Sequence, residues 1–159
     1  MAALLNLNVL LAEDDENDVI LIRRAFKHLN CLGRLVVVPD GEQVLAYFQG
    51  EGKYSDRGSW PLPGVLVLDY GMPRLSGIDV LCWLRTEPRF SKLPVVLWSG
   101  GLPPAEHRML SGLQATSCVK SVDIKESAQL LEEAIVNAVT LTRGGWFREP
   151  RRSAALAAA

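Results

Sequence analysis

The stretch from Val65 to Pro73 constrains the fold of this chain most strongly, because four apolar residues run directly into a carboxylate. Gly71 and Pro73 follow, and an apolar run bounded in this way is typical of a strand buried on both faces. Asp69 is therefore expected at the end of a central parallel strand, where open α/β sheets bind ligands. Asp is also a common turn residue, so Asp69 alone does not distinguish a ligand site from a turn.

Short apolar runs and helical patterns alternate five times along the chain. The expected strands are 8–12, 35–38, 65–68, 94–98 and 117–119. Each is followed by apolar residues at helical spacing. The apolar residues of these expected helices are Val19, Ile22, Phe26 and Leu29; Val44, Leu45, Tyr47 and Phe48, which are expected to face inward; Val80, Leu81 and Leu84; Met109, Leu110 and Leu113; and Leu131, Ile135 and Ala138, which share one face. This alternation predicts an α/β fold with a parallel sheet and helices on both faces.

Turn residues and composition changes set the expected boundaries. Asp40 with Gln43 three residues later resembles a capping box at the start of a helix. The stretch 50–63 is rich in polar and turn residues and is expected to be a surface loop. Residues 1–142 are expected to form one domain and 143–159 a C-terminal tail. Trp146-Phe147 in that tail could contact a partner, a second copy or its own domain.

The composition argues against several classes of function. The net charge is −1, so nucleic-acid binding has no electrostatic support. No apolar run reaches membrane-spanning length, and the N-terminus lacks the basic start of a secretory signal. The three cysteines are widely spaced and form no metal or disulfide pattern. We therefore expect neither nucleic acid nor a membrane as a partner, and a cytoplasmic location.

Polar side chains follow four of the five expected strands. Glu13-Asp14 follow the first, Asp69 the third, Ser99 the fourth and Lys120 the fifth. If the strand order is 2-1-3-4-5, as in known flavodoxin-like sheets, the three carboxylates converge beside the lysine and the hydroxyl. Clustered carboxylates repel one another, and Mg²⁺, which prefers oxygen ligands, removes the repulsion. A carboxylate nucleophile with a metal, a lysine and a hydroxyl suits phosphoryl transfer.

These residues resemble the response-regulator receiver domains of two-component signalling, over about 8–139 of the chain. The matching motifs are an acidic pair, an Asp-x-x-x-Pro-x-x-x-Gly run, a hydroxyl and a lysine, each after a strand. Here they are Glu13-Asp14, then Asp69 with Pro73 and Gly77, then Ser99 and Lys120. The stretch Leu10–Val19 looks more specifically like standalone receivers that partner cyanobacterial and bacterial phytochrome kinases.

The resemblance implies a doubly wound flavodoxin-like sheet of order 2-1-3-4-5 and a phosphoacceptor that is not an enzyme beyond its own phosphorylation and dephosphorylation. Asp69 would take a phosphoryl group from a sensor histidine kinase, with a phytochrome among the candidates. Asp14, Asp69 and the carbonyl of Gly71 would bind Mg²⁺, with Glu13 acting through water. Lys120 would pair with Asp69 and then with a phosphate oxygen. Ser99 would move toward the phosphoryl group, and the change would be read as altered protein contacts.

Four positions depart from the receiver pattern or bear on it. Ser121 follows Lys120, where receivers usually have a proline, so the geometry of this loop is open. Ser117 occupies the position of the usual switch aromatic, so no aromatic flip coupled to Ser99 is expected. Trp98 is expected to be a core or surface aromatic instead. The small Gly100 fits the need for access to an acyl phosphate.

Other functions remain open at this stage. A pseudo-receiver would keep the fold without being phosphorylated, which Ser121 favours and the complete acidic set opposes. An aspartate-based phosphohydrolase needs an Asp-x-Asp run, but position 71 is Gly. A flavin or nucleotide binder needs a phosphate cradle after the first strand, where the acidic residues would repel a phosphate. A homodimer also stays open.

Overall fold

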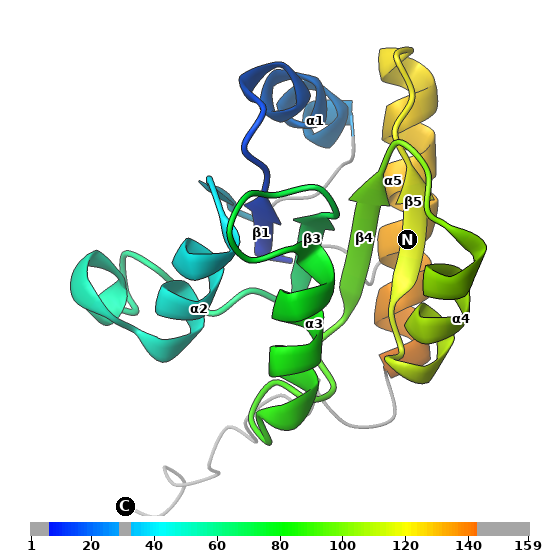
Figure 1. Ribbon diagram of the computed structural model, residues 1–159. Coiled ribbons are helices and arrows are strands. Elements are labelled where there is room, and N and C mark those ends of the chain that lie inside the picture. Colours follow the sequence, from blue (N-terminus) through cyan, green and yellow to red (C-terminus); the bar gives the residue numbers. More distant parts are fainter. Residues whose placement is uncertain (1–6, 29–32, 143–159) are drawn as a thin grey trace, which may run out of the picture.

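Five parallel strands form one sheet in the order β2-β1-β3-β4-β5 (Figure 1). The structure is a computed structural model that describes residues 7–28 and 33–142. The strands are β1 Val9–Ala12, β2 Leu35–Val38, β3 Val65–Asp69, β4 Val95–Ser99 and β5 Thr116–Val119. The expected fold class, strand order and strand positions are thus confirmed. The expected tail 143–159, with Trp146-Phe147, lies outside the described residues, as do Leu29 and Cys31.

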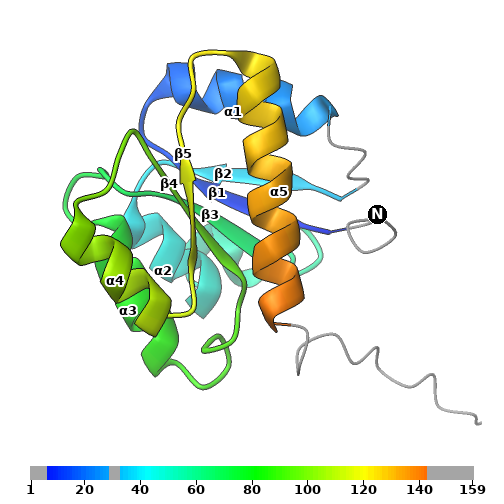
Figure 2. The same ribbon diagram turned by 90° about the vertical axis from the view of Figure 1, so that its right-hand side faces the viewer.

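Two layers of helices cover the sheet. The helices are α1 Glu16–His28, α2 Gly41–Gln49, the 3₁₀ helix η2 Gly52–Ser55, α3 Gly77–Thr86, α4 Pro104–Gly112 and α5 Ile124–Thr142. Figure 2 shows α1 and α5 packed side by side on one face, with α2, α3 and α4 on the other. Among the helices of the described residues, none has the length and apolar character needed to cross a bilayer.

The central strand β3 is buried on both faces, which explains its uninterrupted apolar sequence. Leu66 and Leu68 pack into the core under α2, α3 and α4, while Val65 and Val67 pack into the core under α1 and α5. Side chains of a strand point to alternate faces, so two helical layers require apolar residues at every position. Trp98 of β4 is 1% exposed and belongs to the second core, so its expected role as a core aromatic is confirmed.

Side-chain caps begin α2 and α3. Asp40 accepts a hydrogen bond from the backbone N–H of Gln43 at 2.8 Å, as the sequence predicts for the start of α2. Gln43 does not return the bond, because its side chain accepts from the Tyr54 hydroxyl at 2.7 Å. The complete capping box lies instead at Ser76 and Asp79, where it begins α3.

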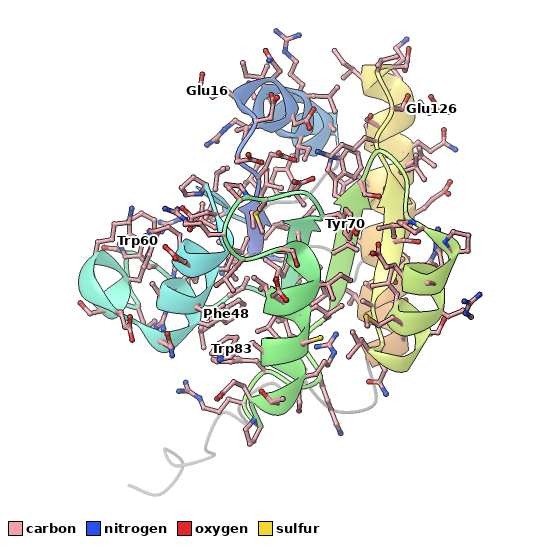
Figure 3. All side chains as sticks on the ribbon, in the orientation of Figure 1. Glu16, Phe48, Trp60, Tyr70, Trp83 and Glu126 are labelled. Carbon is pink, nitrogen blue, oxygen red and sulfur yellow. The ribbon has the colours of Figure 1, made fainter. Side chains whose placement is uncertain are left out.

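The segment 50–63, predicted to be a surface loop, is mostly exposed, but it contains the short helix η2 and buries Tyr54. Tyr54, in η2, is only 2% exposed, and its ring lies 5.0 Å from that of Tyr47 and 5.2 Å from that of Trp60. Arg57 donates to the carbonyls of Tyr47 and Phe48 at 2.8 and 3.0 Å, which satisfies the C-terminal end of α2. Figure 3 shows Trp60 beside α2, at the opposite side of the molecule from α5.

Polar contacts hold helix α4 at both of its ends. Leu110 is the buried residue of α4, whereas Met109, which was also expected in this helix, is 48% exposed. At the N-terminal end, the Tyr70 hydroxyl donates to Glu106 at 2.6 Å. At the C-terminal end, Arg85 donates to the carbonyls of Leu113 and Gln114 at 2.6 and 3.1 Å. Among α2, α3 and α4, helix α4 has the smallest buried apolar face.

The thiols of Cys82 and Cys118 are expected to differ sharply in reactivity. Cys118 is buried in β5, and burial raises the pKa of its thiol to about 12, whereas Cys82 is exposed. Because the thiolate is the reactive form, Cys118 should stay unmodified at pH 8. In a Cys31→Ser background, a disulfide reagent should modify one thiol in the folded protein and two in denaturant. Two rapidly reacting thiols in the folded protein would contradict this burial.

Candidate functional site

The strand register places the candidate residues at one edge of the sheet. Ala12 is level with Leu68, and Asp69 is level with Trp98, so Glu13 and Asp69 end neighbouring strands. Ser99 pairs with Val119, which puts Lys120 directly beyond. They meet at a cleft of about 470 Å³ lined by Glu13, Asp14, Asp15, Asp18, Asp69, Tyr70, Gly71, Ser99, Gly100, Gly101 and Lys120. The structure thus brings together every site residue predicted from the sequence.

Lys120 is surrounded by carboxylates. Its ammonium lies 2.8 Å from Asp69 Oδ1, 2.9 Å from Glu13 Oε2 and 2.5 Å from Asp18 Oδ2. A lysine ammonium has three N–H donors, so these contacts use all of them. Burial alone would lower the pKa of Lys120, but the hydrogen bonds that its ammonium donates to the three carboxylates outweigh this effect and raise the pKa. Lys120 is therefore positively charged at every physiological pH.

Glu13 is the most deeply buried acid of the cleft, at 2% exposed. Burial raises the pKa of its carboxyl group to about 7. The hydrogen bond from Lys120 and one from the Asp15 N–H at 3.1 Å oppose this rise. The negative charge of Asp69 also raises the pKa of Glu13, by less than burial does, in the direction predicted for clustered carboxylates.

The acidic residues fit a small divalent cation. Glu13, Asp14 and Asp69 each offer an oxygen, and these oxygens lie within 4.8 Å of one another. Mg²⁺ holds its ligands at about 2.0–2.1 Å, so opposite ligands lie roughly 4.2 Å apart. The backbone N–H of Gly71 donates to Asp69 Oδ2 at 3.0 Å and orients this carboxylate. The predicted ligation through the Gly71 carbonyl stays a prediction.

Ser99 also lines the cleft. It is 4% exposed, and its hydroxyl oxygen accepts a hydrogen bond from the Gly101 N–H at 3.2 Å. A Cβ atom added at Gly100 would meet nothing within 4 Å, so the space beside Ser99 is open. This space agrees with the access predicted for a ligand on Asp69. The predicted movement of Ser99 stays a prediction.

The loop after Lys120 is held by hydroxyl groups. The residues that the structure describes contain no cis peptide bond, so the bond from Lys120 to Ser121 is trans. Ser121 accepts from the Asp123 N–H at 3.1 Å through its hydroxyl and from the Ser127 hydroxyl at 2.8 Å through its carbonyl. The Lys120 N–H donates to the Ser99 carbonyl at 2.7 Å. Lys120 thus reaches Asp69 without the proline that receivers usually have.

Known proteins with this arrangement are response regulators. No family model matches the chain. Rcp1 of Synechocystis is 29% identical over 89 residues, which cover 56% of this chain and 58% of Rcp1. The phosphorylated cyanobacterial phytochrome response regulator RcpA is 25% identical with a TM-score of 0.72, over 80% of this chain and 90% of RcpA. The chain thus resembles response-regulator receiver domains in sequence and shares their fold.

Two further solved structures that this chain resembles are also of response regulators. A response regulator in red light signalling of R. palustris is 29% identical with a TM-score of 0.72, over 79% of this chain and 89% of that chain. A structure of Rcp1 is of its Mn²⁺-bound form. The matched segment spans less than two thirds of the length of Rcp1.

Two contacts of the receiver domain were not predicted from its sequence. Asp18 reaches Lys120 although it comes from the first turn of α1 and not from a strand end. Tyr70, directly after Asp69, links the cleft to Glu106 of α4. The position of Asp18 in the first turn of α1 could have indicated its contact with the cleft, because the first turn of a helix lies over the strand end that precedes it.

Proposed function

We propose that this receiver domain accepts a phosphoryl group on Asp69 from a phosphohistidine of a sensor histidine kinase, and that Mg²⁺ is required. The contact between Asp69 Oδ1 and the Lys120 ammonium, at 2.8 Å inside an acidic cleft, carries this proposal. The Lys120 ammonium balances the negative charge of the Asp69 carboxylate until a phosphoryl group arrives, and the carboxylate then acts as the nucleophile.

Phosphoryl transfer to Asp69 requires positioning and charge neutralisation more than covalent chemistry. A carboxylate oxygen of Asp69 bonds to phosphorus as the P–N bond to the kinase histidine breaks. The electron pair of the broken P–N bond stays on the imidazole nitrogen. The Gly71 N–H keeps the carboxylate oriented. Lys120 turns one N–H from Asp69 to a phosphoryl oxygen, and the open space beside Gly100 admits the donor.

Mg²⁺ would be held by Asp14, Asp69 and the Gly71 carbonyl, with Glu13 acting through water. When bound, it supplies positive charge to the carboxylates and to the phosphoryl oxygens. The three-carboxylate cluster supports this assignment. So does the chemistry of the donor set, because these ligand atoms are all oxygens and Mg²⁺ is a hard cation.

We propose a phytochrome-type histidine kinase as the partner, supported by the names of the response regulators similar to this chain. We place the phosphorylation-dependent contacts, with kinase or with a second copy, at α4 and β5. Apolar side chains are exposed there, with Met109 at 48% and Val119 at 54%. The polar attachment of α4 through Tyr70 supports a helix whose position responds to the cleft.

Intact mass after incubation with phosphoramidate, with Mg²⁺ or with a chelator, tests the proposal. We expect a gain of one phosphoryl group that requires Mg²⁺ and is removed by hydroxylamine, as an acyl phosphate would be. No gain with Mg²⁺ present would favour the pseudo-receiver. A group that resists hydroxylamine would place the modification on a hydroxyl, and continuous release of phosphate from a phosphate ester would favour a phosphohydrolase.

A further inference from the structure

Asp18 differs from the other two acceptors of the Lys120 ammonium. Glu13 and Asp69 come from strand ends and belong to the three-carboxylate cluster that fits a cation. Asp18 comes from the first turn of α1, and its Oδ2 lies 2.5 Å from the ammonium. Its side chain is one-third exposed, at the outer side of the cleft. Asp18 therefore has a contact with the phosphorylation machinery and no part in the cation site.

The start of α1 fixes the position of Asp18. Asp15 Oδ1 accepts from the backbone N–H groups of Asn17 and Asp18 at 2.7 and 3.3 Å, which caps the helix. Packing of α1 against α5 holds the helix in place (Figure 2). Asp18 thus anchors the ammonium from a rigid element, and its position does not depend on the cleft being filled.

We propose that Asp18 is the positioning residue for Lys120, an inference that rests on the proposed function of the cleft. When Asp69 carries a phosphoryl group, the N–H that contacts Asp69 Oδ1 has to move to a phosphoryl oxygen. The lysine side chain is long and flexible, so this movement is confined only if its other two N–H groups stay bound. Asp18 and Glu13 hold them, and the ammonium turns about these two contacts.

A second effect of Asp18 has the opposite sign. Its negative charge repels an anionic phosphoryl donor, so its removal could also speed the reaction. Repulsion acts across an open, water-filled cleft and is screened by salt, whereas positioning acts through direct contact. At an ionic strength of about 0.5 M, the screening length is about 4 Å. Rates measured at this ionic strength therefore report mainly the positioning effect.

The test compares three variants by their rate of phosphorylation with phosphoramidate and Mg²⁺ in high salt. Asp18→Asn keeps the shape and removes the charge, and we expect a rate roughly three- to tenfold lower, as for one charged contact that is partly exposed. Asp18→Glu keeps a carboxylate and should recover most of the rate. The control Glu16→Gln removes a charge from the same helical turn, on the outer side of α1 (Figure 3), and should leave the rate unchanged.

A spectroscopic readout separates positioning from general destabilisation. The Lys120 ¹H–¹⁵N ammonium signal should be visible in the wild type and in Glu16→Gln, because three acceptors slow its exchange with water. It should be broadened or lost in Asp18→Asn, while the unfolding temperature changes little. An unchanged or faster rate in Asp18→Asn, or an equal loss in Glu16→Gln, would overturn the inference while phosphorylation of the wild type stands. If the wild type itself takes no phosphoryl group, the proposed function fails and this inference fails with it.

Discussion

Asp69→Asn is expected to lose phosphoryl acceptance completely. In the proposed reaction the carboxylate oxygen is the nucleophile, and an amide in its place cannot form an acyl phosphate. Asp69 is 5% exposed, with Lys120 at Oδ1 and the Gly71 N–H at Oδ2. Asn has the same shape and retains one acceptor oxygen, so the chain should still fold. Intact mass after incubation with phosphoramidate and Mg²⁺ should show no added group, and circular dichroism should show an unchanged secondary structure.

The matched control is Asp40→Asn. Asp40 is also buried, at 7% exposed, but it caps α2 and lies outside the acidic cleft. Asn serves as well as Asp at a helix N-cap. The ion pair of Asp40 with Arg74 is lost, but the Arg74 side chain is 59% exposed and such pairs contribute little. This variant should gain one phosphoryl group at the wild-type rate. A phosphorylated Asp69→Asn protein would place the acceptor elsewhere.

Most of the fold follows from local sequence patterns. Strand β3 could be predicted because burial on both faces leaves an unbroken apolar run, and Asp69 because it ends that run. Lys120 could be assigned to the same edge because parallel strands end together, once the strand order was taken from related sheets. The predictions that succeeded thus concern residues whose neighbours are fixed by strand pairing.

The wrong and missing predictions concern contacts that depend on tertiary packing. Tyr54 lies in a polar segment, and only the rings of Tyr47 and Trp60 make its burial favourable. Met109 belongs to the expected helix but is exposed, and α4 is also held through Glu106 and through carbonyls at its C-terminal end. The periodicity of apolar residues in a sequence indicates which side chains are buried. It does not indicate where a helix is attached through hydrogen bonds.

Gly77→Ala is expected to be the most disruptive single-methyl change near the cleft. A Cβ atom at Gly77 would lie 2.4 Å from the Asp69 carbonyl oxygen and 3.1 Å from Leu97 Cδ1. Real contacts of a Cβ atom are longer than about 3 Å, so either α3 or the end of β3 has to move. Strand β3 is held between β1 and β4, and overpacking of this kind costs about 1–3 kcal/mol. The unfolding temperature should fall by several degrees.

The same substitution should also slow phosphorylation of Asp69, because the group displaced by the methyl is the carbonyl of Asp69 itself. Gly112→Ala is the matched control, since a Cβ atom there meets nothing within 4 Å and Ala favours the end of α4. This control should leave the phosphorylation rate unchanged and the stability equal or higher. If Gly77→Ala lowered the unfolding temperature without slowing phosphorylation, α3 would have moved and β3 stayed in place. If both variants behaved alike, the close approach between α3 and β3 would not exist. The glycine at position 77 of the receiver motif is thus explained by the close packing of α3 on β3, and it keeps the acceptor carboxylate in register with Lys120.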